Sequence, residues 1–200
     1  MKAITETPAR ALLAGAGVTA LIVVLWLAIE GADGLGFVSF LLRWVHVFAG
    51  ILWVGLIWFV NFIQLSALQS ADDAGRRTLM TLVVPRVAHS FRHASHLTLV
   101  SGVLLLFTSG YLFGSLVFPT EVYIPPSRTL LVWLGGLGGL AMWAFLHFVI
   151  WPNLRIVLGE VPGDAAAKDL ARQQIKTFAR LNLVLSVPVT FLMVAAAHLY

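Results

Sequence analysis

Six histidines are the residues of this chain most able to do chemistry, because the segments around them are otherwise apolar. An ionisable side chain is costly inside a bilayer, so a histidine there is a candidate functional residue. Hydropathy places the six in two layers near opposite faces of a membrane. One layer contains His46 and His198, and the other contains His89, His93, His96 and His147. Because imidazole is an axial ligand of haem iron, the two layers predict bound haem b, with one or two haems per chain.

The composition indicates a polytopic membrane protein. Of the 200 residues, 60% are hydrophobic and only 11% are charged, whereas soluble domains average roughly half apolar and a quarter charged residues. The chain has no cysteine, which excludes disulfides, iron–sulfur clusters and covalently attached c-type haem. Its net charge of +4 is expected to lie in loops that face the cytoplasm, so we predict no binding of nucleic acid.

Five apolar runs are each long enough to cross about 30 Å of hydrocarbon as a helix. We therefore predict an all-α helical bundle in a lipid bilayer that forms a single membrane domain, 1–200. The third helix is expected to begin before its apolar part, and 159–175 is expected to form a turn and a short amphipathic helix. The predicted membrane helices span approximately 11–29, 37–66, 96–118, 129–151 and 180–199.

The basic residues predict the orientation of these helices. All thirteen Lys and Arg residues except Arg43 and Arg128 lie before the first run, between the second and third runs, or between the fourth and fifth runs and at their edges. Lys and Arg are enriched in cytoplasmic loops of membrane proteins. The N-terminus is therefore expected in the cytoplasm and the C-terminus on the opposite side.

The second run contains the strongest candidate ligand, His46. At 100° per residue, His46, Gly50 and Trp53 fall on one stripe, with Gln64 further along it and Asn61 at its margin. Gly50 lies one turn from His46 and leaves room for a flat macrocycle or a neighbouring helix. A packing face, on which the imidazole bonds to a carbonyl group, is an equally good interpretation of this stripe.

The third and fourth runs supply a second candidate pair. His89, His93 and His96 lie on one helical face, since they are spaced i, i+4 and i+7. His89 and His93 are weaker metal candidates, because they lie near the water boundary, where a solvated face explains them better. His96 lies deeper, at a level similar to His147. The two are therefore candidates to bind an iron from adjacent helices.

The fifth run and two arginines complete the set of candidates. Depth pairs His198 with His46, although a straight helix places His198 away from the face that carries Asn182. Arg43 and Arg92 lie at predicted helix ends, where a guanidinium can pair with haem propionates. Ordinary contact with the lipid interface explains both arginines equally well.

Three segments of the chain carry a resemblance to a known family. They are RWVHVFAGILWVG, HSFRHASHLTLVSGVLLL, and the closing pair MWAFLHFVIWPNLR and RLNLVLSVPVTFLMVAAAHLY. Together they resemble the membrane domain of the bacterial membrane-bound urate oxidase (urate hydroxylase) family. The resemblance covers most of 41–200 and places His46, His89 and His198 at histidine positions of the family. It implies a short form that lacks the family's cytochrome c domain and lies in the bacterial inner membrane. At the other three histidines the family has aromatic residues.

These observations lead to three hypotheses of function. The leading one is a b-type cytochrome that transfers electrons to or from a c-type cytochrome or a respiratory complex. The second is a membrane oxidoreductase that acts on urate or a similar heterocycle. The third is a cofactor-free structural subunit of a larger membrane complex. The small-residue helix faces also make self-association into a homo-oligomer a candidate property.

Overall fold

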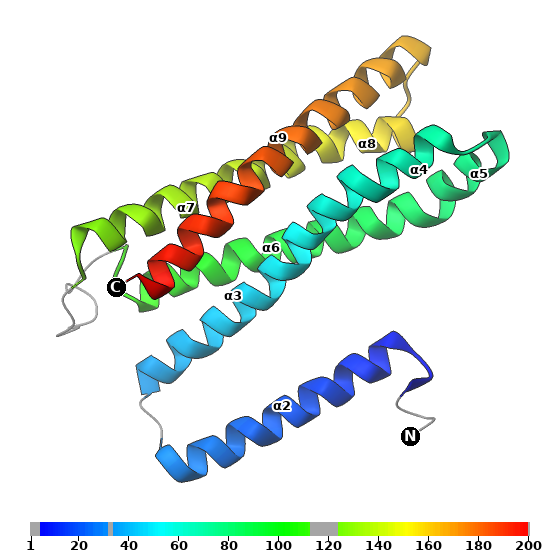
Figure 1. The fold of residues 1–200 in the computed structure, drawn as a ribbon. Coiled ribbons are helices and arrows are strands. Elements are labelled where there is room, and N and C mark those ends of the chain that lie inside the picture. The colour runs from blue at the N-terminus through cyan, green and yellow to red at the C-terminus, as the bar shows by residue number, and fades with distance from the viewer. Residues whose placement is uncertain (1–4, 32–33, 113–123, 200) are drawn as a thin grey trace. The chain divides into compact units, whose positions relative to one another are not determined.

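A computed structural model describes residues 5–31, 34–112 and 124–199, and these residues form helices and turns without a strand (Figure 1). This confirms the predicted all-α fold. Four continuous helical segments among the described residues are long and apolar enough to cross a membrane, so the chain is a multi-pass membrane protein. They are Pro8–Glu30, Gly34–Ser70, Pro126–Leu158 and Ala165–His198.

Two compact units make up the chain, Met1–Val38 and Ser39–Tyr200. The first contains helix α2 (Pro8–Glu30), which begins where the Thr7 side chain accepts a hydrogen bond from the Arg10 N–H at 3.2 Å. None of the α2 residues is buried against other protein atoms. A helix that is apolar on every side is suited to lipid.

Most of α3 (Gly34–Trp58) belongs to the second unit. This helix continues through the π-helical segment η1 (Phe59–Gln64) into α4 (Leu65–Ser70). The chain reverses after Ala71, whose backbone is extended. The Asp72 carboxylate then accepts a hydrogen bond from the Gly75 N–H at 2.8 Å and caps α5 (Asp73–Thr78). The chain returns through η2 (Leu79–Val83) and α6 (Val84–Thr108).

The third helix begins at Val84, before the apolar run 96–118, as predicted. The predicted C-terminal end at residue 118 is wrong. The helix stops at Thr108, and 109–112 form a turn in which Gly110 has a φ of 78°. The hydropathy of the sequence stays high past this point, so it predicts a longer helix. It does not detect the left-handed backbone conformation that glycine allows. Residues 113–118 lie outside the described residues.

Helices α7 (Pro126–Ala144), η4 (Phe145–Ile150) and α8 (Trp151–Leu158) form the next continuous segment. It ends at Gly159, whose φ of 81° closes the helix in the left-handed conformation. The Asp164 carboxylate accepts a hydrogen bond from the Ala167 N–H at 2.8 Å and begins α9 (Ala165–His198). The expected amphipathic helix and the fifth membrane helix are therefore one helix of 34 residues.

Two features stabilise the second unit: the close contact between α7 and α9, and a core of aliphatic and aromatic side chains. A Cβ atom on Gly138 would lie 2.5 Å from Cγ2 of Val189, so the missing side chain lets the two helices approach. The core joins side chains of α3, α6, α7 and η4. Its buried members are Trp53, Ile57, Phe91, Ala94, Met142 and Leu146.

Candidate functional site

His46 lies on α3 and is held against α6. Its Nδ1 atom is 2.8 Å from the carbonyl oxygen of Thr98, so in the neutral ring Nδ1–H donates and Nε2 keeps its lone pair. Gly102 provides the space, because a Cβ atom there would lie 2.8 Å from Cε1 of the imidazole. A hydrogen bond of this kind occurs on packing faces, and it also orients most histidines that bind metals.

The other residues predicted to assist His46 differ in their surroundings. A Cβ atom on Gly50 would lie 3.9 Å from Cγ2 of Thr98, which is an ordinary contact. Trp53 is buried, and its indole N–H has no hydrogen-bond partner among the described residues. Arg43 is exposed. Of the predicted stripe, Gly50 therefore faces α6, and Trp53 enters the core.

His198 is exposed near the end of α9, and its Nδ1 atom is 3.0 Å from the Val194 carbonyl oxygen on the same helix. His46, in contrast, bonds across to α6. The hydrogen bonds and ring contacts of the described residues do not join these two histidines. Each nevertheless keeps its Nε2 atom available for a ligand.

The predicted pair His96 and His147 comes together between α6 and η4. Their ring centroids are 4.2 Å apart, and the ring planes are inclined by 43°. Trp143 contacts both: its Nε1–H donates to Nδ1 of His96 at 3.3 Å, and its ring stacks on His147 with a centroid separation of 4.5 Å. Nδ1 of His147 is 3.0 Å from the Trp143 carbonyl oxygen.

This arrangement does not fit a haem held between the two rings. Each metal–nitrogen bond is about 2 Å long, so two axial nitrogens lie about 4 Å apart and the ring centres lie further apart still. His96 also accepts a hydrogen bond at Nδ1, which in the neutral ring leaves its proton on Nε2. The described residues contain no group of three or more His, Cys, Asp or Glu side chains able to hold a metal.

The remaining predicted residues on α6 lie beside Trp151. The guanidinium carbon of Arg92 is 4.7 Å from the Trp151 ring centroid, which is a cation–π contact. His89 lies 5.9 Å from His93 and 6.0 Å from Trp151, measured between ring centroids, and both histidines are exposed. In this structure Arg92 therefore has a partner other than a propionate.

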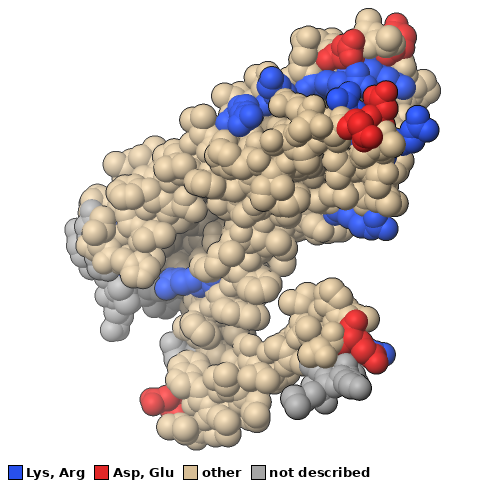
Figure 2. Space-filling view, turned by 45° about the vertical axis from the view of Figure 1, so that its right-hand side comes forward, with Lys and Arg blue, Asp and Glu red and all other residues tan. Residues whose placement is uncertain are grey.

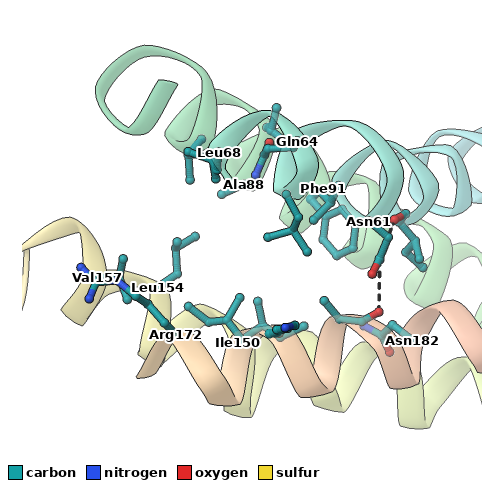
Figure 3. A pocket seen from close by; sticks show the side chains of 18 of the residues that line it. Asn61, Gln64, Leu68, Ala88, Phe91, Ile150, Leu154, Val157, Arg172 and Asn182 are labelled. Atoms are coloured by element: carbon teal, nitrogen blue, oxygen red, sulfur yellow. Dashed lines mark hydrogen bonds between the residues drawn. The ribbon is translucent and has the colours of Figure 1, made fainter. Parts of the chain in front are cut away.

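A cavity of about 550 Å³, which the sequence did not predict, is lined by four of the basic residues of the second unit. Many of the basic residues of this unit gather at one of its ends (Figure 2). Residues of η1, α4 and α6 form one wall, and residues of η4, α8 and α9 form the facing wall (Figure 3). Apolar side chains line its middle, among them Leu68, Phe91 and Leu154.

Three buried amide side chains line the cavity, with Asn61 and Asn182 at its inner end and Gln64 nearer its middle (Figure 3). Asn61, Gln64 and Asn182 have exposed fractions of only 4%, 9% and 1%. The Asn61 amide N–H₂ donates to the carbonyl oxygens of Ile57 at 2.9 Å and Ala179 at 3.2 Å, which ties η1 to α9. Asn61 Oδ1, Gln64 Oε1 and both polar atoms of Asn182 have no partner among the described residues.

Unpaired buried polar atoms of this kind cost about 1–3 kcal/mol each unless a ligand or water satisfies them. Two of the three amides, Asn61 and Gln64, lie in η1. Short π-helical segments often occur at functional sites, because they redirect side chains that a regular helix would place elsewhere. The amide cluster is therefore the clearest feature built to receive a ligand.

Four cationic side chains line the cavity, and none of the described lining residues is acidic. They are Arg76, Arg172, Lys176 and Arg180. Arg172 forms an ion pair with Asp169, which is not a lining residue, and its Nη1 atom is 2.6 Å from Oδ1 of Asp169. The Arg76 Nε–H donates to the Leu68 carbonyl at 3.2 Å. Lys176 and Arg180 have no ion pair within the described part of the chain. The cavity thus favours an anion.

The sequence contains a signal that would have found this cavity. Asn61, Gln64 and Asn182 are amides within apolar runs, where a polar side chain requires an explanation. Asn182 lies on the same wall of the cavity as Lys176 and Arg180, because all three residues belong to the continuous helix α9. The sequence did not predict this continuity.

Comparison of the chain with models of known protein families, with curated proteins and with solved structures gives no match. The resemblance to the urate oxidase family therefore stays a prediction.

Proposed function

We propose that the chain is an electron-transfer protein of the bacterial inner membrane that binds haem b through His46 and exchanges electrons with a c-type cytochrome or a respiratory complex. The observation that carries this proposal is the Nδ1 contact of His46 with the Thr98 carbonyl, which leaves Nε2 available in a membrane helix. When bound, haem supplies one-electron redox chemistry. The protein supplies an oriented imidazole and a setting of low polarity.

The surroundings of His46 give three residues distinct roles in this proposal. The Thr98 carbonyl selects the ring tautomer, and Gly102 leaves room for the ring against α6. His198 is the proposed second ligand, because its Nδ1 atom is likewise bonded to a carbonyl and its Nε2 is available. Since the rings of His96 and His147 do not fit around an iron, we propose one haem rather than two.

The absorption spectrum of protein purified from haem-replete cells tests this proposal. We expect a Soret band and, after reduction, an α-band. His46→Ala should abolish both, whereas Thr98→Val should keep both, because it retains the backbone carbonyl and the shape of the side chain. Wild-type protein without these bands, or His46→Ala protein that retains them while folded, would contradict haem binding at His46.

The cavity favours a second candidate function, an oxidoreductase that acts on an organic anion. Its cations attract negative charge, and its unpaired amides can bind the polar edge of a substrate. The resemblance makes urate the first compound to test. Membranes that carry the protein, supplied with a c-type cytochrome, should then reduce that cytochrome in a urate-dependent manner. If they do not, urate is not the substrate.

A further inference from the structure

We propose that the cavity binds a compact organic anion that carries an O–H or N–H donor on an atom next to its charged group. The inference rests on the second candidate function and deepens it, because it names the class of ligand for the same cavity. Three features of the lining support it: the unpaired amides, the cations that lie beside them, and the apolar side chains that make up most of the remainder.

The amides at the inner end of the cavity require a hydrogen-bond donor. The Asn61 N–H₂ group donates to the carbonyl oxygens of Ile57 and Ala179, which fixes the orientation of the amide, and its Oδ1 has no partner among the described residues. Asn182, on the facing wall, lacks a partner for its oxygen and for its nitrogen (Figure 3). A ligand that contacts these buried atoms therefore satisfies them only if it has a donor as well as an acceptor.

Two cations lie close to these amides along α9. Lys176 and Arg180 precede Asn182 by six and two residues, which corresponds to about 9 and 3 Å along the helix axis. Asn61 reaches the same level of the helix, because it bonds to the carbonyl oxygen of Ala179, the residue before Arg180. The charge of a bound anion and its donor are therefore expected close together.

The charges of the lining favour an anion at this level. Lys176 and Arg180 have no ion-pair partner among the described residues, whereas Arg172 is already paired with Asp169. None of the described lining residues is acidic. A negatively charged group beside Asn182 thus gains attraction from two cations without meeting a carboxylate.

Apolar side chains make up most of the remaining lining and determine the rest of the ligand. Leu68, Phe91 and Leu154 are among them (Figure 3). The cavity, at about 550 Å³, has the size of pockets that bind small organic molecules. A 2-hydroxy acid with a short alkyl chain combines a charge, an adjacent donor and an apolar body. An acid with its hydroxyl group at the far end of the chain does not.

Four matched probes test the proposal on the full chain in lipid nanodiscs, by titration calorimetry with empty nanodiscs as the reference. They are 2-hydroxyhexanoate, 6-hydroxyhexanoate, hexanoate and the neutral hexane-1,2-diol. We expect 2-hydroxyhexanoate to bind about tenfold more tightly than either of the other acids, because only it presents a donor beside its charge. The diol should bind less tightly than 2-hydroxyhexanoate, since it lacks the charge.

Variants of the cavity lining separate the contributions of donor and charge. Asn182→Leu should remove the preference for 2-hydroxyhexanoate over hexanoate. Asn182→Asp, which keeps the size of the side chain, should weaken the binding of all three acids and leave the diol unchanged, because it places a carboxylate beside the anion.

The cations have a matched control on the same helix. The double variant Lys176→Gln, Arg180→Gln should weaken the binding of the three acids and leave the diol unchanged. Lys168→Gln removes a charge of α9 outside the cavity lining and should change the binding of none of the probes.

Several outcomes would overturn the proposal. Equal binding of 2-hydroxyhexanoate and hexanoate to the wild-type chain would refute the donor, and equal binding of the two hydroxy acids would refute its place beside the charge. Binding of all four probes at the level of empty nanodiscs would refute the ligand class. Failure of the second candidate function is recognised separately: if 2-hydroxyhexanoate binds as expected while membranes oxidise neither it nor urate, the cavity binds the anion without oxidising it.

Discussion

Asn61 and Asn182 are both buried amides at the inner end of the cavity, but their hydrogen bonding gives them different roles. Asn61 joins two helices through the carbonyls of Ile57 and Ala179, whereas neither polar atom of Asn182 has a partner among the described residues. Asn61 therefore contributes to the fold. The unpaired polar atoms of Asn182 lower the stability of the fold and remain available to a ligand, as is common for residues of binding sites.

This difference predicts opposite effects of the same substitution. Asn61→Leu should lower the free energy of unfolding by about 1–3 kcal/mol, because it removes two hydrogen bonds and leaves the Ala179 carbonyl without this donor. Asn182→Leu should leave stability unchanged or raise it in ligand-free protein, because no hydrogen bond is lost. Tryptophan fluorescence during thermal unfolding in detergent measures both. Equal destabilisation by the two changes would contradict the assigned roles.

The sequence predicted individual residues better than their partners. His46 stood out because it is an ionisable residue in an apolar helix, and matched depth brought His96 and His147 together correctly. The Thr98 carbonyl and Gly102 could not be predicted as neighbours of His46, since hydropathy carries no information about which helix faces lie side by side. For the same reason, the direct contact between the rings of His96 and His147 could not be predicted.

At the scale of the helices, the spacing of glycines in α7 determines which face approaches α9. A Cβ atom on Gly135 would lie 3.1 Å from Cε of Met193, and one on Gly138 would lie 2.5 Å from Cγ2 of Val189. Gly136 and Gly139 have no heavy atom within 4 Å of such a position. The two pairs therefore have different consequences although they look alike in the sequence.

Alanine substitutions should separate these faces. Gly138→Ala should lower stability by about 1–3 kcal/mol, because the added methyl group overpacks the contact with Val189. Gly139→Ala should be neutral or raise stability by up to about 1 kcal/mol, since alanine favours the helix and the space is open. Thermal unfolding in the same detergent compares them. A larger loss for Gly139→Ala would contradict the contact between α7 and α9.

Helix boundaries show where sequence patterns are informative. Caps such as Asp164 and turn glycines such as Gly159 lie where a helix begins or ends, and apolar runs gave the approximate positions of the membrane helices. Hydropathy alone divided α9 into two helices, because it registers the change from charged to apolar residues and not the continuity of backbone hydrogen bonds. The hydropathy pattern does not predict the π-helical segments η1 and η4.

For the molecule as a whole, the distribution of basic residues concerns both orientation and binding. Basic residues of α5, α8 and the first half of α9 gather at one end of the second unit (Figure 2), and those of α5 and α9 include four that line the cavity. Lys and Arg are enriched on the cytoplasmic side of membrane proteins. If the predicted orientation holds, the cavity receives its ligand from the cytoplasmic side. The same prediction places His46 nearer the opposite face.

The absence of cysteine from the chain makes this orientation directly testable, because single cysteines can be introduced without removing any. Ser127 and Gln173 are exposed residues near the starts of α7 and α9. A membrane-impermeant maleimide should label Ser127→Cys in intact spheroplasts but label Gln173→Cys only after lysis. The reverse pattern would place the cavity on the external side, and labelling of both before lysis would contradict the assignment of these helix starts to opposite faces.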